Sequence, residues 1–539
     1  MDSSSTGRRD IGWPSILGKI VVVVGLALGS VASAWAQSAQ PSPSSAAGQW
    51  AMGGQNLHNT RSQDRQTKLG IHNASRLKLK WSRAVHGDVS ATPAVVDGAV
   101  YIPDWGGYLT KLDASTGKLI WEHRIDSFAG EPQGAVSRTS PAVVDGVVYI
   151  GDQNGGHLLA LNAHTGNLIW RSNAINPATL AIITQSPVVY KGVVYVGASS
   201  SEEAVAGNPN YACCTFQGSF SAVDAKTGQI KWTTPMIPNN GGAPGGYSGA
   251  AVWSSTPAID EATNTVFITT GNNYTVPASV RACEAAGGSA ATCLSPDDHV
   301  DSVVALDMAT GRIKWSTGVQ GYDSWTFACM ANASPSTNCP PPPGEDFDIG
   351  SGPNLIKVNN PDGTKRLLVG AGQKSGIYWL LDRQTGAIVS STTIGPGSDL
   401  GGILWGTAAD GTRIYVASSD GSKVAYTVNG ATVTTGSFAA IDPATGKILW
   451  QLADPSGSAT DYGAVSVSNG VVFAGSMSGH MYALNGATGA VLWDYVGQGS
   501  SNAGPAIDSN GTVYWGNGYS RSGLGTQSFT FYAFSVDGT

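Results

Sequence analysis

The chain has 539 residues, of which only 12% are charged, and 71 of them are glycine. The net charge of -7, without any basic block, excludes nucleic-acid binding, which requires a positive surface. Low charge and abundant turn-forming residues predict a large all-β protein with many tight connections.

The first 36 residues are predicted to form a signal peptide. Arg8, Arg9 and Lys19 precede an apolar run at 20–28, and Ala-Trp-Ala at 34–36 fits a cleavage signal. The run is too short for a stable membrane span. Residues 37–49 are rich in Ser, Pro and Ala and predict a disordered leader. We therefore expect a periplasmic or secreted protein whose folded domain covers residues 50–539.

The six cysteines predict disulfides, because their number is even and the chain is expected to be exported. Sequence proximity favours three pairs, Cys213–Cys214, Cys283–Cys293 and Cys329–Cys339. The chain has no Cys-x-x-Cys-His motif, so we expect no covalently attached c-type haem in it.

One phrase recurs along the chain: an apolar residue, Asp or Asn, two further residues, Thr-Gly, and a short strand that usually ends in Trp. The pattern predicts a hairpin in which Gly supplies the positive φ of the turn. Seven copies occur, at Leu112–Trp121, Leu161–Trp170, Val223–Trp232, Leu306–Trp315, Leu381–Ser390, Ile441–Trp450 and Leu484–Trp493.

A second hairpin precedes most copies, as in Ser140–Ile150, so each unit has four antiparallel strands. Such units bury their faces only by repeating around an axis, which predicts a β-propeller. An eighth unit is split between the Trp strand 77–81 and the strand 531–537. The sequence therefore predicts eight blades, closed by the N- and C-terminal strands, with long insertions at 277–296 and 322–350.

The hairpin between Trp253 and Asn272 carries the first indication of a site. Its two strands should bring both residues to the same edge of one sheet. A flat aromatic face beside an oxygen ligand suits a planar, metal-chelating cofactor, although a core Trp and a turn-capping Asn would explain these two residues alone.

The repeats and the residues near the axis resemble the pyrroloquinoline quinone (PQQ) alcohol dehydrogenases over essentially the whole mature chain. Three segments, Trp50–Arg61, Cys213–Ser219 and Asp298–Ser302, are most similar to polyvinyl alcohol dehydrogenases and their relatives.

The resemblance implies a Ca²⁺ site built from three side chains beside the quinone. Glu202 is similar to the metal-binding Glu of the family, with Glu203 as the close alternative. Asn272 matches the metal-binding Asn, and Asp323, in Tyr-Asp-Ser-Trp at 322–325, matches the catalytic Asp. All of these side chains offer the hard oxygen ligands that Ca²⁺ prefers.

The resemblance also implies a set of quinone contacts. Trp253 matches the Trp on which the ring stacks. Arg138 and Thr184 match residues that hold carboxylate or carbonyl oxygens of PQQ. Lys374 stands where the family places a cation on the reactive carbonyls, which would stabilise negative charge during reduction. Trp405 is a further candidate for the wall of the quinone pocket; the alternative is that it is a core residue of the propeller.

Two features depart from the typical family pattern. Many members carry a disulfide between adjacent cysteines that covers the quinone, just before the position of Arg138. Here the corresponding pair, Cys213–Cys214, follows Glu202 instead, and its contact with PQQ is a hypothesis. At Ser90, in Ser-Ala-Thr-Pro at 90–93, typical members have a carboxylate.

The implied reaction is oxidation of an alcohol by hydride transfer to Ca²⁺-bound PQQ. Ca²⁺ polarises the quinone carbonyl, and Asp323 takes the hydroxyl proton as general base. A separate cytochrome c or other acceptor then receives the electrons. Two alternatives remain: a non-enzymatic exported propeller scaffold, and a PQQ sugar dehydrogenase. Long loops vary freely on a fixed scaffold, so the substrate, small or polymeric, stays open.

Overall fold

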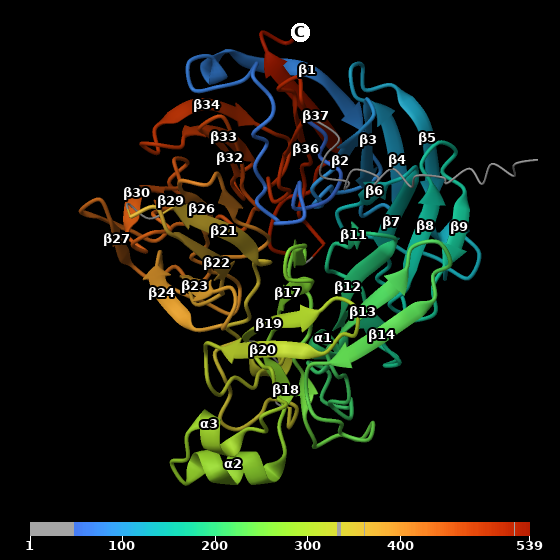
Figure 1. Ribbon diagram of the computed structural model, residues 1–539, viewed down its shortest axis with the longest axis vertical. Coiled ribbons are helices and arrows are strands. Elements are labelled where there is room, and N and C mark those ends of the chain that lie inside the picture. Colours follow the sequence, from blue (N-terminus) through green and yellow to red (C-terminus); the bar gives the residue numbers. More distant parts are fainter. Residues whose placement is uncertain (1–47, 331–335, 360–361, 522) are drawn as a thin grey trace, which may run out of the picture. The chain divides into compact units, whose positions relative to one another are not determined.

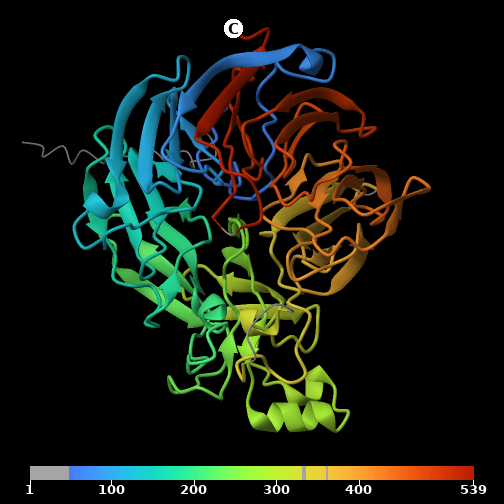
Figure 2. The same ribbon diagram turned by 180° about the vertical axis from the view of Figure 1, so that it is seen from behind.

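The computed structural model describes residues 48–330, 336–359, 362–521 and 523–539. The predicted signal peptide at 1–36 and most of the predicted leader at 37–49 lie outside the described residues. Eight antiparallel sheets are arranged around a common centre, which confirms the predicted eight-bladed propeller (Figures 1 and 2). Within the described residues, no helix has the length and apolar character needed to cross a membrane.

Each blade has four strands, which are ordered from the centre of the ring outwards. Blade 1 contains β2 (Ala94–Val96), β3 (Ala99–Pro103), β4 (Tyr108–Asp113) and β5 (Leu119–Arg124). Blade 2 contains β6 (Ala142–Val144), β7 (Val147–Gly151), β8 (Leu158–Asn162) and β9 (Leu168–Arg171). Blade 3 contains β11 (Val188–Tyr190), β12 (Val193–Ser200), β13 (Ser219–Asp224) and β14 (Ile230–Pro235), with β10 (Ala181–Ile182) paired to β12.

Blade 4 contains β16 (Ala258–Asp260), β17 (Thr265–Thr269), β19 (Ser302–Asp307) and β20 (Ile313–Gly318). Blade 5 contains β21 (Asn354–Asn359), β22 (Lys365–Gly372), β23 (Ile377–Asp382) and β24 (Ile388–Thr393). Blade 6 contains β25 (Ala408–Ala409), β26 (Ile414–Ser418), β29 (Ser437–Ile441) and β30 (Ile448–Ala453).

Blade 7 contains β31 (Ser466–Ser468), β32 (Val471–Gly475), β33 (His480–Asn485) and β34 (Val491–Val496). Blade 8 joins the two ends of the chain, because β1 (Leu77–Ala84) pairs with β37 (Thr530–Val536), beside β36 (Val513–Trp515) and β35 (Ala506–Ile507). The split eighth unit is therefore confirmed.

The remaining elements belong to connections. They are β15 (Ser248–Gly249) paired with β18 (Asn273–Thr275), β27 (Tyr426–Val428) paired with β28 (Ala431–Val433), α1 (Glu202–Val205), α2 (Ala278–Ala285), α3 (Ala290–Cys293), and three 3₁₀ turns, η2 (Ala74–Arg76), η3 (Ile125–Ser127) and η4 (Phe327–Cys329). Helices α2 and α3 form the insertion predicted at 277–296 and project beyond the blades (Figure 1).

The recurring phrase docks each blade onto the next. The indole Nε1 of Trp232 donates to the carbonyl oxygen of Met308, which follows Asp307 in the next turn. A Cβ on Gly311, whose φ is +73°, would lie 2.6 Å from the Trp232 ring, so only glycine allows this close packing. The same Trp-to-carbonyl bond is made by Trp81, Trp121, Trp170, Trp315 and Trp450.

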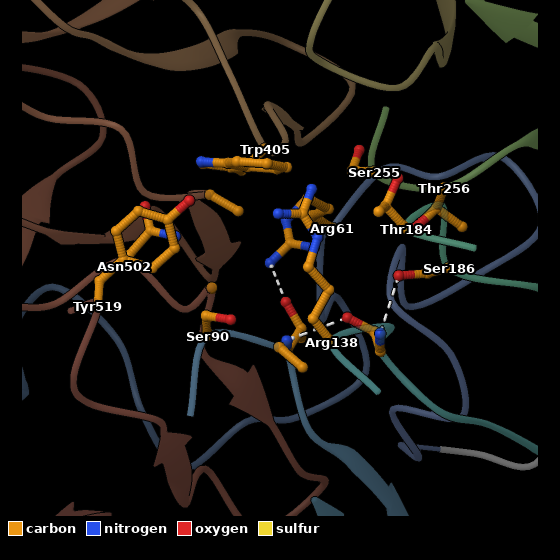
Figure 3. Close-up of a pocket in the computed structure, with 15 residues that line it drawn as sticks. Arg61, Ser90, Arg138, Thr184, Ser186, Ser255, Thr256, Trp405, Asn502 and Tyr519 are labelled. Carbon is orange, nitrogen blue, oxygen red and sulfur yellow. Dashed lines mark hydrogen bonds between the residues drawn. The ribbon is translucent and has the colours of Figure 1, made fainter. Parts of the chain in front are cut away.

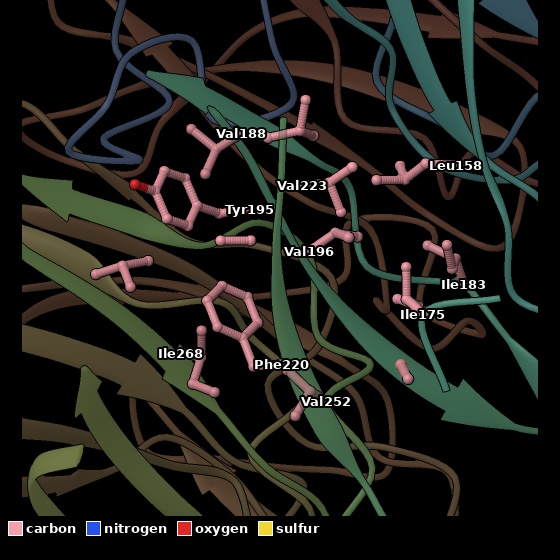
Figure 4. Packing of buried hydrophobic residues seen from close by; sticks show 14 of the residues in the cluster. Leu158, Ile175, Ile183, Val188, Tyr195, Val196, Phe220, Val223, Val252 and Ile268 are labelled. Carbon is pink, nitrogen blue, oxygen red and sulfur yellow. The ribbon is translucent and has the colours of Figure 1, made fainter. Parts of the chain in front are cut away.

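Apolar side chains fill the space between neighbouring blades. Around β12 and β13, a cluster that includes Val196, Phe220 and Val223 is fully buried between blades 2 and 4 (Figure 4). Full burial of one such side chain contributes about 1.5–3 kcal/mol. The outer strand β14 alternates between half-buried and exposed positions, whereas the inner strands β2 and β6 are buried throughout.

Residues 50–63 form an axial belt that crosses the centre of the ring (Figure 1). This belt hydrogen-bonds to the inner strands of seven blades. For example, Val143 N donates to Ala51 O, Ile259 N to Leu57 O and Val467 N to Arg61 O. The inner strands of the other four blades hydrogen-bond to the belt through Val95, Leu355, Ala409 and Ile507.

Candidate active site

A cavity of about 260 Å³ lies among the connections that lead into and out of the inner strands. Of the predicted site residues, Arg138, Thr184, Trp253, Asn272, Lys374 and Trp405 all line it. A smaller cavity of about 50 Å³ adjoins it and shares Arg138, Thr184, Trp405 and Tyr519 with it (Figure 3). Residues more than 260 positions apart in the sequence are thus brought together by the ring.

Two indoles form an aromatic corner of the larger cavity. The rings of Trp253 and Trp405 have centroids 5.3 Å apart and lie at 76° to each other. The Lys374 ammonium lies 5.5 Å from the Trp253 ring, and the Arg138 guanidinium lies 4.6 Å from the Trp405 ring. Thr184 donates its hydroxyl to the carbonyl oxygen of Trp253. Cations and aromatic faces therefore meet at this corner.

Five acids gather near Lys374 and the Trp253 indole: the half-buried Glu203 and the buried Asp301, Asp323, Asp346 and Asp348. We call them the axial acid cluster. The nearby cation is Lys374, whose Nζ lies 2.8 Å from Asp346 Oδ1 and 2.7 Å from Asp348 Oδ2. Burial opposes the charge on Lys374, but these two carboxylates outweigh it and raise its pKa well above the ordinary value.

The cluster contains carboxylate oxygens that have no hydrogen-bond partner. They are Oε1 of Glu203 and both oxygens of Asp301. Burial, and then the charge of Asp348, raises the pKa of Glu203 to about 8. Burial, and then the charge of Asp323, raises the pKa of Asp301 well above its usual value. Unpaired buried carboxylates are costly, so this arrangement is suited to binding a cation.

The structure distinguishes the surroundings of the two adjacent glutamates. The Glu202 carboxylate accepts hydrogen bonds from Thr215 N at 2.8 Å, Phe216 N at 2.7 Å and Tyr211 Oη at 2.7 Å. It therefore anchors a loop instead of facing the cavity, which Glu203 lines. The two residues are consecutive on α1, and successive helical side chains point about 100° apart.

The aspartate predicted as catalytic, Asp323, is not among the residues that line the cavity. Asp323 is 1% exposed, and its two oxygens accept the backbone N–H groups of Asp346 and Phe347 at 3.0 and 2.7 Å. Asp323 thus holds the loop that carries Asp348, and Asp348 lines the cavity, as does Asp399. Asp348 Oδ1 accepts the backbone N–H of Asn272 at 2.5 Å.

Sequence reasoning missed Asp346 and Asp348, although a signal was present. Glu-Asp-Phe-Asp at 345–348 places acids two residues apart just before a buried strand. Charged residues beside the inner end of a blade are unusual in a chain with so few charges.

All three predicted disulfides are present: Cys213–Cys214, Cys283–Cys293 and Cys329–Cys339. The first pair does not line the cavity. Cys214 is completely buried in the core around β12 and β13, next to the loop anchored by Glu202. The hypothesis that this pair contacts PQQ gains no support from the residues that line the cavity. Ser90 lines the smaller cavity and accepts a hydrogen bond from Trp105 Nε1.

Comparison with known proteins places this site in a family. A family model described as outer membrane protein assembly factor BamB matches residues 23–317 and 374–524. Polyvinylalcohol dehydrogenase from Sphingopyxis sp. (strain 113P3) is 32% identical over 92% of this chain and 77% of its own length. Polyvinylalcohol dehydrogenase from Pseudomonas sp. is 29% identical, with 91% and 77% covered.

A solved structure supports the fold independently. Quinohemoprotein alcohol dehydrogenase from Comamonas testosteroni superposes with a TM-score of 0.68 at 23% identity, covering 91% of this chain and 81% of that protein. Together with the Trp-docked blades and the similarity along the sequence, these findings show that the chain belongs to the family of PQQ-dependent alcohol dehydrogenases.

Proposed function

We propose that the protein oxidises secondary alcohols, including those of polyvinyl alcohol, with PQQ and Ca²⁺ bound in the larger cavity. The observation that carries the proposal is the unbalanced axial acid cluster beside the Trp253 indole, with Lys374 between them. The similarity to two polyvinylalcohol dehydrogenases supports the substrate class.

The residues at the cavity fit a hard cation. Glu203 offers an unpartnered carboxylate oxygen, and Asp348 offers a second carboxylate. The Asn272 amide nitrogen donates to the carbonyls of Asn273 and Trp325, which leaves its side-chain oxygen as the ligand it presents. Carboxylate and amide oxygens are the ligands that Ca²⁺ prefers, so we assign Glu203, Asn272 and Asp348 as its protein ligands.

The same cavity fits a flat, anionic cofactor. Trp253 offers an aromatic face, while Arg138 and Thr184 offer donors for carboxylate oxygens. Burial lowers the pKa of Arg138, and none of the ion pairs among the described residues joins it to an acid. When bound, PQQ and the metal supply the two-electron acceptor and the Lewis acid of the reaction.

Three residues of the chain have distinct roles in the proposed reaction. Asp348, at the cavity wall, takes the hydroxyl proton of the alcohol on a carboxylate oxygen. Lys374 offsets the charge of Asp346 and Asp348 and stabilises negative charge that develops beside it. Asp323 positions the Asp348 loop through two backbone N–H groups. The product is an aldehyde or a ketone.

The surroundings of the cavity suit a substrate with apolar parts. Ile182, Phe327, Leu400, Leu404 and Leu524 also line it, and Phe327 is 39% exposed. These side chains reduce water access around the reacting hydroxyl group. Because the chain has no haem attachment motif, a separate acceptor protein takes the electrons, and the three disulfides support export.

The test is reconstitution of the purified protein with PQQ and Ca²⁺. We expect a new visible absorption band and dye reduction with secondary alcohols and polyvinyl alcohol. Asp348→Asn should bind PQQ yet lose dye reduction by about 10²–10⁴-fold, the usual contribution of a general base. No PQQ uptake with excess Ca²⁺, or turnover confined to aldoses, would contradict the proposal.

A further inference from the structure

A second group of buried charges lies on blade 2, outside the cavity. Arg171 Nε donates to Glu131 Oε1 at 2.6 Å, and Arg171 Nη2 lies 2.8 Å from His157 Nδ1. His157 Nδ1 lies 2.8 Å from Asp152 Oδ2. The side chains of Glu131 and Asp152 are completely buried. We call these four residues the blade-2 ion cluster.

The cluster is not suited to a metal ion, although its acids and histidine have the right ligand types. Their ligand atoms lie within 4.8 Å of one another. However, Arg171 already contacts both Glu131 and His157 and supplies the positive charge. A divalent cation would have to displace this guanidinium against their mutual repulsion.

The cluster joins two segments of the chain that lead to the cavity. Asp152 and His157 belong to the turn between β7 and β8, and Arg171 ends β9. Glu131 lies on the connection from blade 1, seven residues before Arg138. Next to Glu131, a Cβ on Gly130 would lie 3.3 Å from Arg171 Cδ, so this connection lies directly against the Arg171 side chain.

The same β7–β8 turn holds both cofactor segments through its backbone. Gln153 N donates to Val136 O at 3.0 Å, two residues before Arg138. Ile183 N donates to Asp152 O at 2.8 Å, immediately before Thr184. The Asp152 carboxylate in turn accepts the backbone N–H of His157 at 2.9 Å, which fixes the shape of the turn.

We propose that the blade-2 ion cluster is a positioning device that fixes Arg138 and Thr184 in the geometry that binds the carboxylates of the cofactor. The inference rests on the proposed function, in which these two residues contact PQQ. Groups held by buried, hydrogen-bonded supports lose less freedom on binding, so the supports contribute to affinity without touching the ligand.

The experiment measures PQQ affinity by quenching of tryptophan fluorescence in the full-length protein with excess Ca²⁺. Arg171→Met and Glu131→Ala should weaken PQQ binding by about tenfold or more, which corresponds to about 1.4 kcal/mol. Glu131→Gln keeps an acceptor for Arg171 and should stay within about threefold of the wild type. Should Arg171→Met fail to fold, His157→Gln provides a milder change in the same cluster.

A matched control exists at blades 4 and 5. Arg383 Nη1 lies 3.4 Å from Asp260 Oδ2, and both side chains are nearly buried, far along the chain from Arg138 and Thr184. Arg383→Met should lower thermal stability to a similar degree but leave PQQ affinity unchanged. Ca²⁺ binding without PQQ should be unchanged in the blade-2 variants, because the proposed Ca²⁺ ligands lie outside blade 2.

Three outcomes would overturn the inference, and they differ from one another. If the wild type takes up no PQQ, the proposed function fails, and this inference fails with it. If the wild type binds PQQ and Arg171→Met binds it equally well, only the positioning role fails. If Arg171→Met and Arg383→Met lose affinity equally, the effect is general destabilisation.

Discussion

The axial acid cluster and the blade-2 ion cluster are both buried and acidic, but their charges balance differently. The first has five acids around Lys374, with three carboxylate oxygens unpartnered on Glu203 and Asp301. The second has two acids facing Arg171 and His157, and one carboxylate oxygen, Oε2 of Glu131, is unpartnered. A larger excess of buried negative charge indicates a cation that binds from outside, whereas a smaller excess is offset mainly by a cation of the protein itself.

A raised pKa does not separate the two clusters. Burial raises the pKa of Glu203 to about 8 and that of Glu131 to about 7. What separates them is the number of cations and donors that face the acids. A raised pKa of an acid therefore identifies a functional site only when the cations and hydrogen-bond donors that face the acid are also considered.

The largest expected effect on stability comes from removing Lys374, the lysine beside the axial acid cluster. Lys374→Met leaves Asp346 and Asp348 buried without a counter-charge, which should lower the free energy of unfolding of the metal-free protein by about 3–5 kcal/mol. Ca²⁺ should restore part of the loss, since it supplies the missing positive charge. Denaturant unfolding with and without Ca²⁺ measures both effects.

Removing the arginine of the blade-2 ion cluster provides the contrast to that result. Arg171→Met should also destabilise the protein, but Ca²⁺ should not restore the loss. A Ca²⁺ rescue of equal size in Arg171→Met and Lys374→Met would remove the distinction between the clusters.

The next effect separates two neighbouring acids. Glu202→Gln loses charge-assisted bonds to the amides of Thr215 and Phe216, so stability should fall by about 2 kcal/mol with or without Ca²⁺. Glu203→Gln should not destabilise the metal-free protein, but it should abolish most of the rise in melting temperature that Ca²⁺ produces. Calorimetric scans of both variants test this; a Ca²⁺ response lost in Glu202→Gln alone would reverse the assignment.

The smallest expected effect is a pH dependence from Glu131. Burial, and then the charge of Asp152, raises its pKa from 4.5 to about 7. Between these values the folded protein keeps a proton that the unfolded chain has lost, so the contribution of Glu131 to stability falls as pH rises from about 4.5 to 7. Glu131→Gln lacks this decline and should therefore gain stability relative to the wild type as pH rises across the range. A constant difference between the two proteins from pH 5 to 7.5, in denaturant unfolding, would contradict the assigned cause.

The blades could be predicted from the sequence because their determinants are local and repeated. Asp307, Thr310 and Gly311 form one turn by themselves, with Asp307 accepting from the backbone and hydroxyl groups of Thr310. The repeat even tolerates a change at its final Trp position. In one copy Ser390 replaces the Trp, and Gly446, the glycine of the turn in the next blade, packs against Ser390.

The site was predictable only where a residue lies next to a repeated element. Trp253 and Asn272 flank the β16–β17 hairpin, so the hairpin fixes their positions. Glu202 and Glu203 could not be separated, because the difference is the rotation of a short helix set by hydrogen bonds from residues 211–216. Asp348 was missed because its place depends on Asp323, more than 20 residues earlier, which holds its loop from behind.

The axial belt constrains the order in which the molecule can assemble. Residues 50–63 are synthesised before every blade, yet Gln63 bonds to Ile507, 444 residues further on. The belt can therefore pair with the first blades early, but its Gln63 end has no partner in blade 8 until that blade has been made, and closing such distant contacts is slow. Maturation of this protein should consequently end in one late step, in which this end of the belt bonds to blade 8 as the ring closes.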